Sequence, residues 1–278
     1  MGIKGLSSFV KSYGTIKKMS DYSGLTVAID APIYMFKFKY LSTTEQFINN
    51  FKTQISLFKK HNISPIYIFD GKHPKEKQET REARKKTQTI FITEEDNQLL
   101  RELFNESGVR WVTAPSEAEK LCSYFSKIGK VDFAMSNDYD TFVFGCKKLL
   151  VYSKNEYVEY LPETILEDLN LSRNEFLEIS IASGCDFYPS GIPGIGIKKG
   201  LKLVEKGKKI EDWGATQEFL DILPTIKNIF TDFTEEERVE IPKISISQVI
   251  EFENSLIEID DIGSDTDTDT ESNSDELN

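Results

Sequence analysis

Along the N-terminal half of the chain, short apolar runs alternate with longer stretches in which apolar residues recur every three or four positions. The runs lie at residues 25–30, 64–71, 131–135 and 148–152. Their nearly continuous apolar character is typical of strands buried on both faces of a parallel sheet. Between the first two runs, helical spacing is seen for Phe47, Phe51, Ile55 and Phe58. This alternation predicts an α/β fold in which helices flank a parallel sheet.

The rest of the chain is expected to be mostly helical. Residues 2–14 carry apolar side chains at helical spacing and end at Gly14, which predicts a short helix. Residues 174–204 have the pattern of helix, turn and helix, and residues 216–230 and 246–259 are expected to be helices that pack on the core. We therefore expect an α/β core at 1–160, a helical region at 161–250 and a tail at 251–278.

Aspartates stand at the ends of three predicted strands. Asp30 and Asp70 each close an apolar run, and Asp138 and Asp140 follow the run at 131–135. Taken singly, each aspartate could serve a turn. Because ligands bind outside the carboxyl ends of parallel strands, the fold would bring all four carboxylates into one crevice.

Two glutamates in the segment 114–119 can be read in two ways. Ser116 and Glu119 have the spacing of a capping box, which would open a helix at this point. Alternatively, Glu117 and Glu119 could join the aspartates as metal ligands if both lie in the irregular first turn of that helix. Both readings remain open from this segment alone.

Composition narrows the possible chemistry. A chain of 278 residues with 39% apolar residues can form a globular core of one large or two small domains. The three cysteines are widely spaced and suggest no disulfide framework, so a reducing, intracellular compartment fits best. Two histidines argue against histidine-rich zinc sites and a Ser-His-Asp triad. No apolar run reaches the length of a membrane span, and no signal-peptide pattern is seen.

The net charge of −12 is unevenly distributed. Residues 251–278 contain eleven acidic residues and no Lys or Arg, which leaves 34 basic and 46 − 11 = 35 acidic residues elsewhere. The acidity of the chain is therefore mostly that of its tail. Residues 263–278 are of low complexity and are expected to be disordered, with solubility or contact with an unknown protein partner as their role.

A basic stretch lies between Asp70 and Glu117. It contains seven basic and three acidic residues within positions 72–86. Such a stretch is ordinarily a solvated helix face. Lys77, Arg81 and Arg84 share one helical face, however, and beside an acidic crevice that face could meet phosphates.

A second basic element begins at residues 191–199, whose sequence is GIPGIGIKK. A Gly-x-Gly turn, formed here by Gly194 and Gly196, exposes backbone N–H groups at the start of a helix. The glycines could serve only the turn. Followed by Lys198, Lys199 and Lys202, they favour an anchor for the backbone of duplex DNA.

Six segments in a fixed order give the chain a family likeness: MGIKGL, VAIDA, YIFDGK, APSEAE, NDYDTFVFG and GCDFYPSGIPGIGIKKG. Over about residues 1–205, the chain resembles the flap endonuclease and xeroderma pigmentosum group G structure-specific nucleases. The resemblance implies a PIN-like α/β nuclease core, a helical arch at about 72–95 and a helix-two-turn-helix element at about 174–205.

The resemblance also assigns roles to individual residues. It implies two Mg²⁺ ions, replaceable by Mn²⁺, held by seven carboxylates: Asp30, Asp70, Glu117, Glu119, Asp138, Asp140 and Asp186. Lys77 and Arg84 correspond to the two catalytic residues that contact the scissile phosphate. DNA contacts are implied for Gly2, Tyr34, Arg81, Gly194, Gly196, Lys198, Lys199 and Lys202, and the helix-two-turn-helix allows a monovalent cation. The spacing from Asp30 to Tyr34 is two residues shorter than the family pattern.

We therefore predict a Mg²⁺-dependent endonuclease and 5′ exonuclease that cleaves DNA at flaps, nicks or branched junctions in replication, repair or recombination. The arch segment is shorter than in cellular flap endonucleases, so a requirement for a threaded 5′ end stays open. No convincing sliding-clamp motif is present, and a monomer in the nucleus or at a viral replication site is expected. The alternatives are a non-catalytic DNA-binding scaffold and an RNA-directed 5′ nuclease.

Overall fold

The computed structural model describes residues 2–40, 42–87 and 89–243, and the side chains of Arg84 and Thr87 are not described. The helix expected at 246–259 and the acidic tail therefore lie outside the described residues. Within the described ranges, no helix combines the length and the apolar character needed to cross a membrane.

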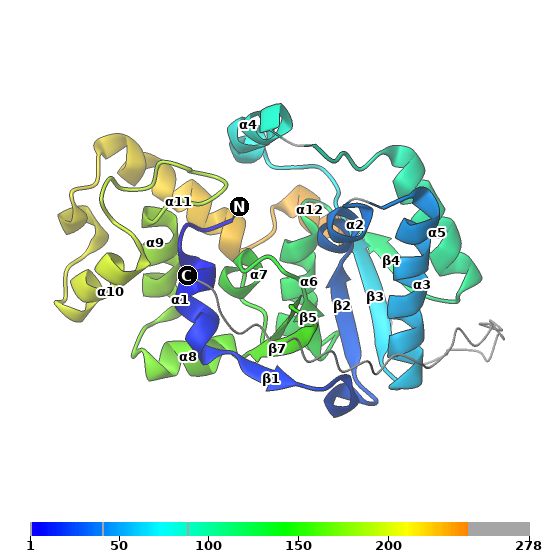
Figure 1. Ribbon diagram of the computed structural model, residues 1–278. Helices are drawn as coiled ribbons and strands as arrows, with labels where there is room; N and C mark the ends of the chain where they lie inside the picture. Colours follow the sequence, from blue (N-terminus) through cyan, green and yellow to red (C-terminus); the bar gives the residue numbers. More distant parts are fainter. Residues whose placement is uncertain (1, 41, 88, 244–278) are drawn as a thin grey trace, which may run out of the picture.

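A seven-stranded sheet with the order β1-β7-β6-β5-β2-β3-β4 forms the centre of the molecule (Figure 1). Its strands are β1 Thr15–Lys17, β2 Thr26–Asp30, β3 Ser64–Phe69, β4 Arg110–Thr113, β5 Phe133–Met135, β6 Leu149–Ser153 and β7 Glu156–Tyr160. Strands β2 to β6 are parallel, as predicted. At one edge the sheet is mixed, because β7 runs antiparallel to both β6 and β1. The four apolar runs all became strands.

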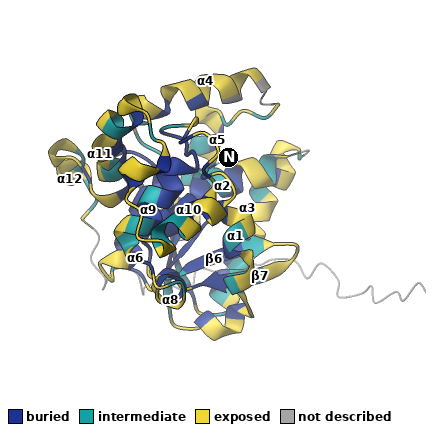
Figure 2. Ribbon diagram, turned by 90° about the vertical axis from the view of Figure 1, so that its left-hand side faces the viewer, coloured by how far each residue is buried: buried dark blue, intermediate teal, exposed yellow. Residues whose placement is uncertain are grey.

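Helices cover both faces of the sheet. The α-helices are α1 Leu6–Val10, α2 Ala31–Lys39, α3 Thr44–Lys60, α4 Gln78–Thr87, α5 Glu94–Glu106, α6 Ala118–Lys127, α7 Asp140–Val143, α8 Pro162–Asp168, α9 Arg173–Ala182, α10 Ile197–Glu205, α11 Gln217–Thr231 and α12 Glu235–Glu240. Short 3-10 turns are η1 Lys11–Tyr13, η2 Met19–Tyr22, η3 Lys75–Lys77 and η4 Ile210–Trp213. Figure 2 shows buried residues inside this shell and mostly exposed ones along α4.

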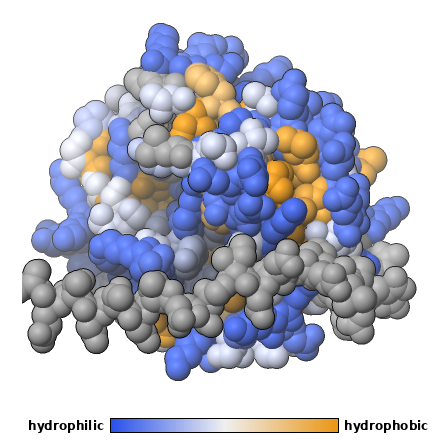
Figure 3. Space-filling model, turned by 45° about the vertical axis from the view of Figure 1, so that its right-hand side comes forward, coloured by the Kyte–Doolittle hydropathy of each residue, from blue (hydrophilic) through white to orange (hydrophobic). Residues whose placement is uncertain are grey.

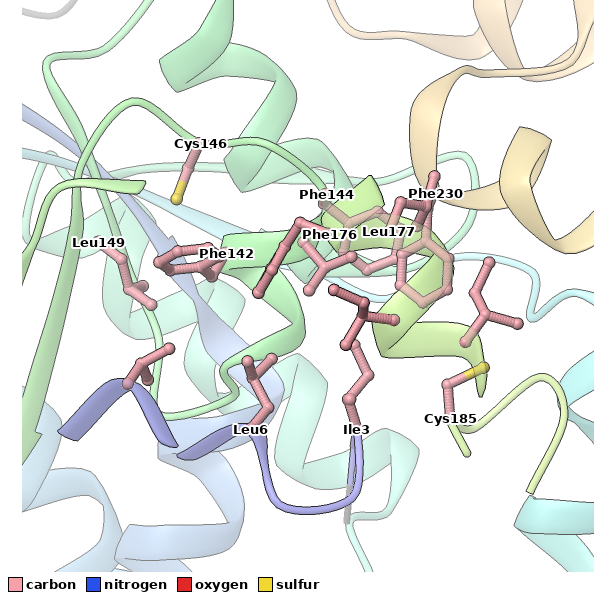
Figure 4. Close-up of a cluster of buried hydrophobic side chains, with 14 of the residues drawn as sticks. Ile3, Leu6, Phe142, Phe144, Cys146, Leu149, Phe176, Leu177, Cys185 and Phe230 are labelled. Carbon is pink, nitrogen blue, oxygen red and sulfur yellow. The ribbon is translucent and has the colours of Figure 1, made fainter. Parts of the chain in front are cut away.

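The buried apolar residues form two clusters, one on each side of the sheet. One cluster packs α2, α3 and α5 against the sheet and includes Phe51, Tyr67 and Phe104. The other joins α1, α6, α7, α9 and α11. In the close-up of the latter, Ile3 and Leu6 lie near Phe142 and Phe176 (Figure 4). Because this second cluster also contains residues of the helical region, α9 and α11 are packed onto the α/β core.

The carboxyl ends of the parallel strands point towards α4, which projects above this edge of the sheet (Figure 1). The described chain also begins near this edge, since Ile3 donates its backbone N–H to Asp140. Residues that follow the strands therefore meet the start of the chain and the base of α4 at one place.

Candidate active site

The seven predicted carboxylates come from five segments at the carboxyl edge of the sheet. Asp30 ends β2, and Asp70 directly follows β3. Glu117 and Glu119 lie at the start of α6 after β4, and Asp138 and Asp140 follow β5. Asp186 lies in the turn after α9. The alternation of strands and helices thus explains why acids 156 positions apart in the numbering, from 30 to 186, reach one edge.

Asp30 and Asp138 share a hydroxyl partner. The Ser136 hydroxyl donates to Asp30 Oδ2 at 2.7 Å, and the backbone N–H of Asp138 donates to the Ser136 oxygen at 3.0 Å. Asp30 Oδ1 also accepts from the Ile33 backbone N–H at 3.3 Å, which caps α2. Because β2 and β5 are adjacent and parallel, this serine connects the carboxylate of Asp30 with the backbone of Asp138.

Asp70, rather than Ser116, occupies the amino end of α6. Its Oδ1 accepts the backbone N–H of Ala118 at 2.9 Å, and the N-cap residue Glu117 makes no side-chain cap bond. The Ser116–Glu119 capping box, one of the two readings of this segment, is therefore not formed. A helix amino end favours a nearby carboxylate. Glu117, the extended N-cap residue, and Glu119, in the first turn, both lie within 4 Å of Lys77 Nζ.

A glycine brings the start of the chain close to the second pair of aspartates. A Cβ placed on Gly2 would lie 2.6 Å from Asp140 Oδ1 and 2.9 Å from Asp138 Oδ1. Real Cβ atoms do not approach oxygens so closely, and Gly2 also has a φ of +68°. The backbone N–H of Ile3 then donates to Asp140 Oδ1 at 2.9 Å. Only glycine fits this position without displacing the carboxylates.

A lysine ammonium lies among the carboxylates. Lys77 Nζ is 2.6 and 2.7 Å from the two oxygens of Glu117, 3.5 Å from Glu119 Oε1 and 3.6 Å from Asp186 Oδ2. His73 Nδ1 lies 3.3 Å from Glu117 Oε1. Lys77 thus connects α6, the turn after α9 and the base of α4 through one positive charge.

Burial and mutual repulsion oppose ionisation of the aspartates. Burial, followed by the charge of Asp70, raises the pKa of Asp30 to about 7. Burial also raises the pKa of Asp70 and of Asp138. For Asp140, burial and then the charge of Asp138 raise the pKa well above its ordinary value. Burial and the neighbouring carboxylates thus disfavour the charged form of these four aspartates, and a cation close to them would favour it.

The pKa values of the two glutamates shift in opposite directions, and Lys77 affects both. Burial, followed by the charge of Glu117, raises the pKa of Glu119 well above its ordinary value. For Glu117, burial is outweighed by His73 and Lys77, and its pKa is lowered. Burial would lower the pKa of Lys77, but the charges of Glu119 and Glu117 outweigh it and raise that pKa. Of the two glutamates, the one whose pKa is lowered is Glu117, which lies closer to the ammonium of Lys77.

Among the described residues, no three acidic, histidine or cysteine side chains converge closely enough to hold a metal ion as they stand. The donor set nevertheless suits a hard divalent cation, because it consists of carboxylate oxygens, five of the seven carboxylates being buried and those of Asp70 and Asp138 half-buried. The ammonium of Lys77 takes the place that a cation among Glu117, Glu119 and Asp186 would take.

The base of α4 is attached to the site by a hydrogen bond. The buried Thr80 hydroxyl donates to the Asp186 backbone carbonyl at 2.7 Å. Arg81, one residue further, is exposed and lines a cavity that also reaches Lys77. The Arg84 side chain lies outside the described residues, so its predicted contact with phosphate stays a prediction.

The structure gives the proposed stacking role of Tyr34 no support. Its side chain is fully buried, and its ring packs against Phe38 with 5.7 Å between centroids. Phe36 was missed by the sequence analysis, although it stands two positions further on, where the family spacing falls. It is 39% exposed and lines the same cavity as Lys77 and Arg81. The spacing from Asp30 was the signal that could have identified it.

The predicted DNA anchor is formed by α9, α10 and the turn between them. Lys198, Lys199 and Lys202 are all exposed on α10, whose amino end follows Gly196. At Gly194 the backbone φ is +76°, so a side chain would strain this turn. The lysines and the helix amino end thus face solvent together, which is the arrangement expected of a phosphate-binding turn.

Two family models and several known proteins match this chain in sequence. A model of the XPG N-terminal domain matches residues 1–90, and a model of the XPG I-region matches residues 108–186. Flap endonuclease 1 of Aedes aegypti is 30% identical over 259 residues, and that of Glycine max is 31% identical over 261 residues. Each alignment covers 76% of this chain and 68% of the relative.

Solved structures share the fold. The flap endonuclease-1 of Methanococcus jannaschii matches with a TM-score of 0.66 and 23% identity, covering 85% of this chain and 93% of the other. The catalytic core of Rad2 in complex with a DNA substrate matches with a TM-score of 0.68 and 23% identity, covering 83% of this chain and 85% of the other. Human GEN1 in complex with Holliday junction DNA matches with a TM-score of 0.62 and 21% identity, covering 86% of this chain and 63% of the other.

Proposed function

This chain belongs to the family of flap endonucleases and XPG nucleases, and on that basis we propose that it is a structure-specific DNA nuclease. It hydrolyses phosphodiester bonds at 5′ flaps, nicks or branched junctions, with divalent metal ions as cofactor. The observation that carries the proposal is the buried acidic site at the carboxyl edge of the sheet, with the Lys77 ammonium among Glu117, Glu119 and Asp186.

In this proposal the seven carboxylates hold two Mg²⁺ or Mn²⁺ ions. Asp30, Asp70 and Glu117 are on the side of β2 and β3, whereas Asp138, Asp140 and Asp186 are on the side of the chain start. Glu119 lies between them. When bound, such a pair of ions activates a water molecule and stabilises the leaving oxygen.

The residues of the chain itself have three tasks. Ser136, the amino end of α6 and the Ile3 backbone N–H orient carboxylates, so the donors are fixed before DNA arrives. Lys77, released from Glu117, contacts the scissile phosphate together with Arg84 and balances the charge that grows on it. Burial of the acids excludes bulk water, which strengthens each of these interactions.

Elements that lie away from the acids also bind the DNA. The exposed lysines of α10 and the turn at Gly194 contact the phosphates of the duplex without reading its sequence. Phe36 of α2 supplies an exposed aromatic ring near the cleavage site, the task predicted for Tyr34. The protein recognises the shape of a junction because these two contacts lie on different elements.

The test is cleavage of a labelled double-flap DNA, with the cut mapped to the nucleotide in the presence of Mg²⁺ and of chelator. We expect a Mg²⁺-dependent cut at or one nucleotide inside the flap base. The same assay on a matched RNA flap identifies an RNA-directed nuclease if only RNA is cut. Tight binding of the DNA flap without any cut would replace this proposal with a scaffold role.

A further inference from the structure

Charged side chains normally lie at the surface of a protein. On the face displayed in Figure 3 the surface is accordingly hydrophilic, with apolar side chains in separate patches. Among the described residues, Lys77 and Lys120 are the two lysines that are buried. Lys77 belongs to the proposed metal site, whereas Lys120 is 5% exposed and follows Glu119 in the first turn of α6. A buried ammonium destabilises the fold unless it is paired, so the position of Lys120 depends on the groups around it.

Two residues from the end of the described chain surround the Lys120 ammonium. Its Nζ lies 3.1 Å from Glu237 Oε2 of α12 and 4.5 Å from the centre of the Phe233 ring. Glu237 Oε2 also accepts the backbone N–H of Thr234 at 2.8 Å, and the Thr234 hydroxyl accepts the backbone N–H of Glu237 at 3.2 Å. This capping box fixes the Glu237 carboxylate, which in turn holds the ammonium.

The ring of Phe233 extends the contact along α6. Phe233 is buried, and it packs edge-on against Tyr124 with 5.2 Å between ring centroids. Tyr124 lies one helical turn after Lys120 on α6. The connection between α11 and α12 therefore contacts two successive turns of α6, the first of which carries Glu119.

The same segment also reaches the other side of the proposed metal site. Phe230, near the end of α11, packs edge-on against Phe187 with 5.2 Å between ring centroids. Phe187 directly follows Asp186, and the centre of its ring lies 5.8 Å from Lys77 Nζ. Residues 230–237 thus contact the immediate neighbours of Glu119 and of Asp186, the two acids that lie 3.5 and 3.6 Å from Lys77 Nζ.

We propose that the segment 230–237 sets the separation between the glutamates of α6 and Asp186, with Lys120, Glu237 and Phe230 as positioning residues for metal binding. The inference rests on the proposed function, in which Glu117, Glu119 and Asp186 hold divalent cations. Groups that orient the ligands of a metal alter its affinity without touching it. When the Glu237 carboxylate is lost, the Lys120 ammonium must reach water or another acid, and the first turn of α6 moves with it.

Glu237→Gln tests the inference, because glutamine keeps the length of the side chain and an oxygen for the Thr234 N–H. The dissociation constant for Mn²⁺ is measured by calorimetry on the full chain without DNA, and unfolding in urea is measured with chelator. We expect Glu237→Gln to bind Mn²⁺ about tenfold more weakly than wild type, at the low end of the effect of groups that orient metal ligands. Cleavage of the flap DNA should need more Mg²⁺, while kcat at saturating Mg²⁺ stays close to that of wild type.

Three further variants separate positioning from general stability. Glu235→Gln makes the same charge change at an exposed residue of α12 and should leave Mn²⁺ affinity unchanged. Lys120→Arg keeps the charge beside Glu237 and should retain most of the affinity. Phe230→Leu keeps an apolar side chain but removes the ring contact with Phe187, and it should also weaken Mn²⁺ binding.

The outcomes distinguish the inference from the proposed function. If wild type binds Mn²⁺ and both Glu237→Gln and Phe230→Leu bind it equally well, the inference is overturned, whether or not these variants lose stability in urea. The segment would then only stabilise the fold, and the proposed function would be unaffected. If wild type itself binds no Mn²⁺, the metal-dependent function fails, and the inference fails with it.

Discussion

Buried acidic side chains are costly, and their cost at this site depends on which positive charge accompanies them. Asp30, Glu119 and Asp140 are each less than 10% exposed. Burial and neighbouring charges raise the pKa of all three, and the charge of Lys77 offsets part of this rise at Glu119 and Asp140. Sites that bind or react commonly retain such destabilising groups. The acids are therefore expected to weaken the fold when no divalent cation is bound.

This cost can be measured with Asp30→Asn. The pKa of Asp30 is about 7 in the folded protein and near 3.9 in the unfolded chain. Between these values the folded state binds more protons, so stability falls as pH rises. With chelator at pH 8, Asp30→Asn should raise the free energy of unfolding by roughly 1–3 kcal/mol, and at pH 4 the gain should vanish. Urea unfolding at both pH values checks this. A variant that is less stable than wild type at pH 8 would contradict it.

At the scale of elements, apolar runs were sufficient to predict the strands that carry Asp30, Asp70 and Asp138. The missed strands are short or half-exposed: β1 has three residues, and β4 has no buried residue. The antiparallel edge arises from the β6–β7 hairpin, whose turn residues Lys154 and Asn155 both have positive φ. Their sequence lacks the Asn-Gly signal of such turns, so this part could not be predicted.

The same comparison applies to the site. The positions of the carboxylates follow from strand order, which the apolar runs reveal. The partner of each carboxylate cannot be predicted in this way, because it depends on packing between distant segments. The ion pairs of Lys77 with Glu117 and Asp186 are an example. The burial of Tyr34 could not be predicted from the sequence either, because it results from the packing of α2 on α3.

The attachment of α4 to the site predicts an effect of Thr80→Val. This change removes the hydrogen bond to the Asp186 carbonyl and leaves that buried oxygen without this donor. We expect a loss of about 1–2 kcal/mol in stability and a fall in kcat of roughly tenfold, because Lys77 is no longer held in place. KM should change little. Thr80→Ser keeps the hydroxyl and should behave as wild type; unchanged kcat in Thr80→Val would show that α4 needs no such attachment.

At the scale of the whole molecule, one apolar cluster connects the acidic site with the helices of the proposed DNA anchor. Ile3 and Leu6 of the chain start pack with residues of α7, α9 and α11 in this cluster (Figure 4). The proposed division between a core at 1–160 and a helical region at 161–250 stays a prediction. Because both parts share buried residues, a junction would meet the acids and the lysines of α10 at a set separation.

The anchor predicts a salt-dependent loss of binding in the double variant Lys198→Glu with Lys199→Glu. Each lost phosphate contact reduces the slope of log K against log salt by about 0.9, so the slope should fall by roughly 2. The loss should be similar for DNA of different sequences. Lys60→Glu with Lys127→Glu makes the same charge change at the ends of α3 and α6 and serves as the control. A loss that depends on sequence would argue against backbone contacts.

The most direct test of the acidic site as the catalytic centre is Asp138→Ala, with cleavage and binding of the same double-flap DNA measured in parallel. Asp212→Ala, which removes an exposed aspartate of η4, is the control. We predict that Asp138→Ala loses Mg²⁺-dependent cleavage by at least about a thousandfold while its dissociation constant for DNA stays within a few-fold of wild type. Retained turnover in Asp138→Ala would contradict the account.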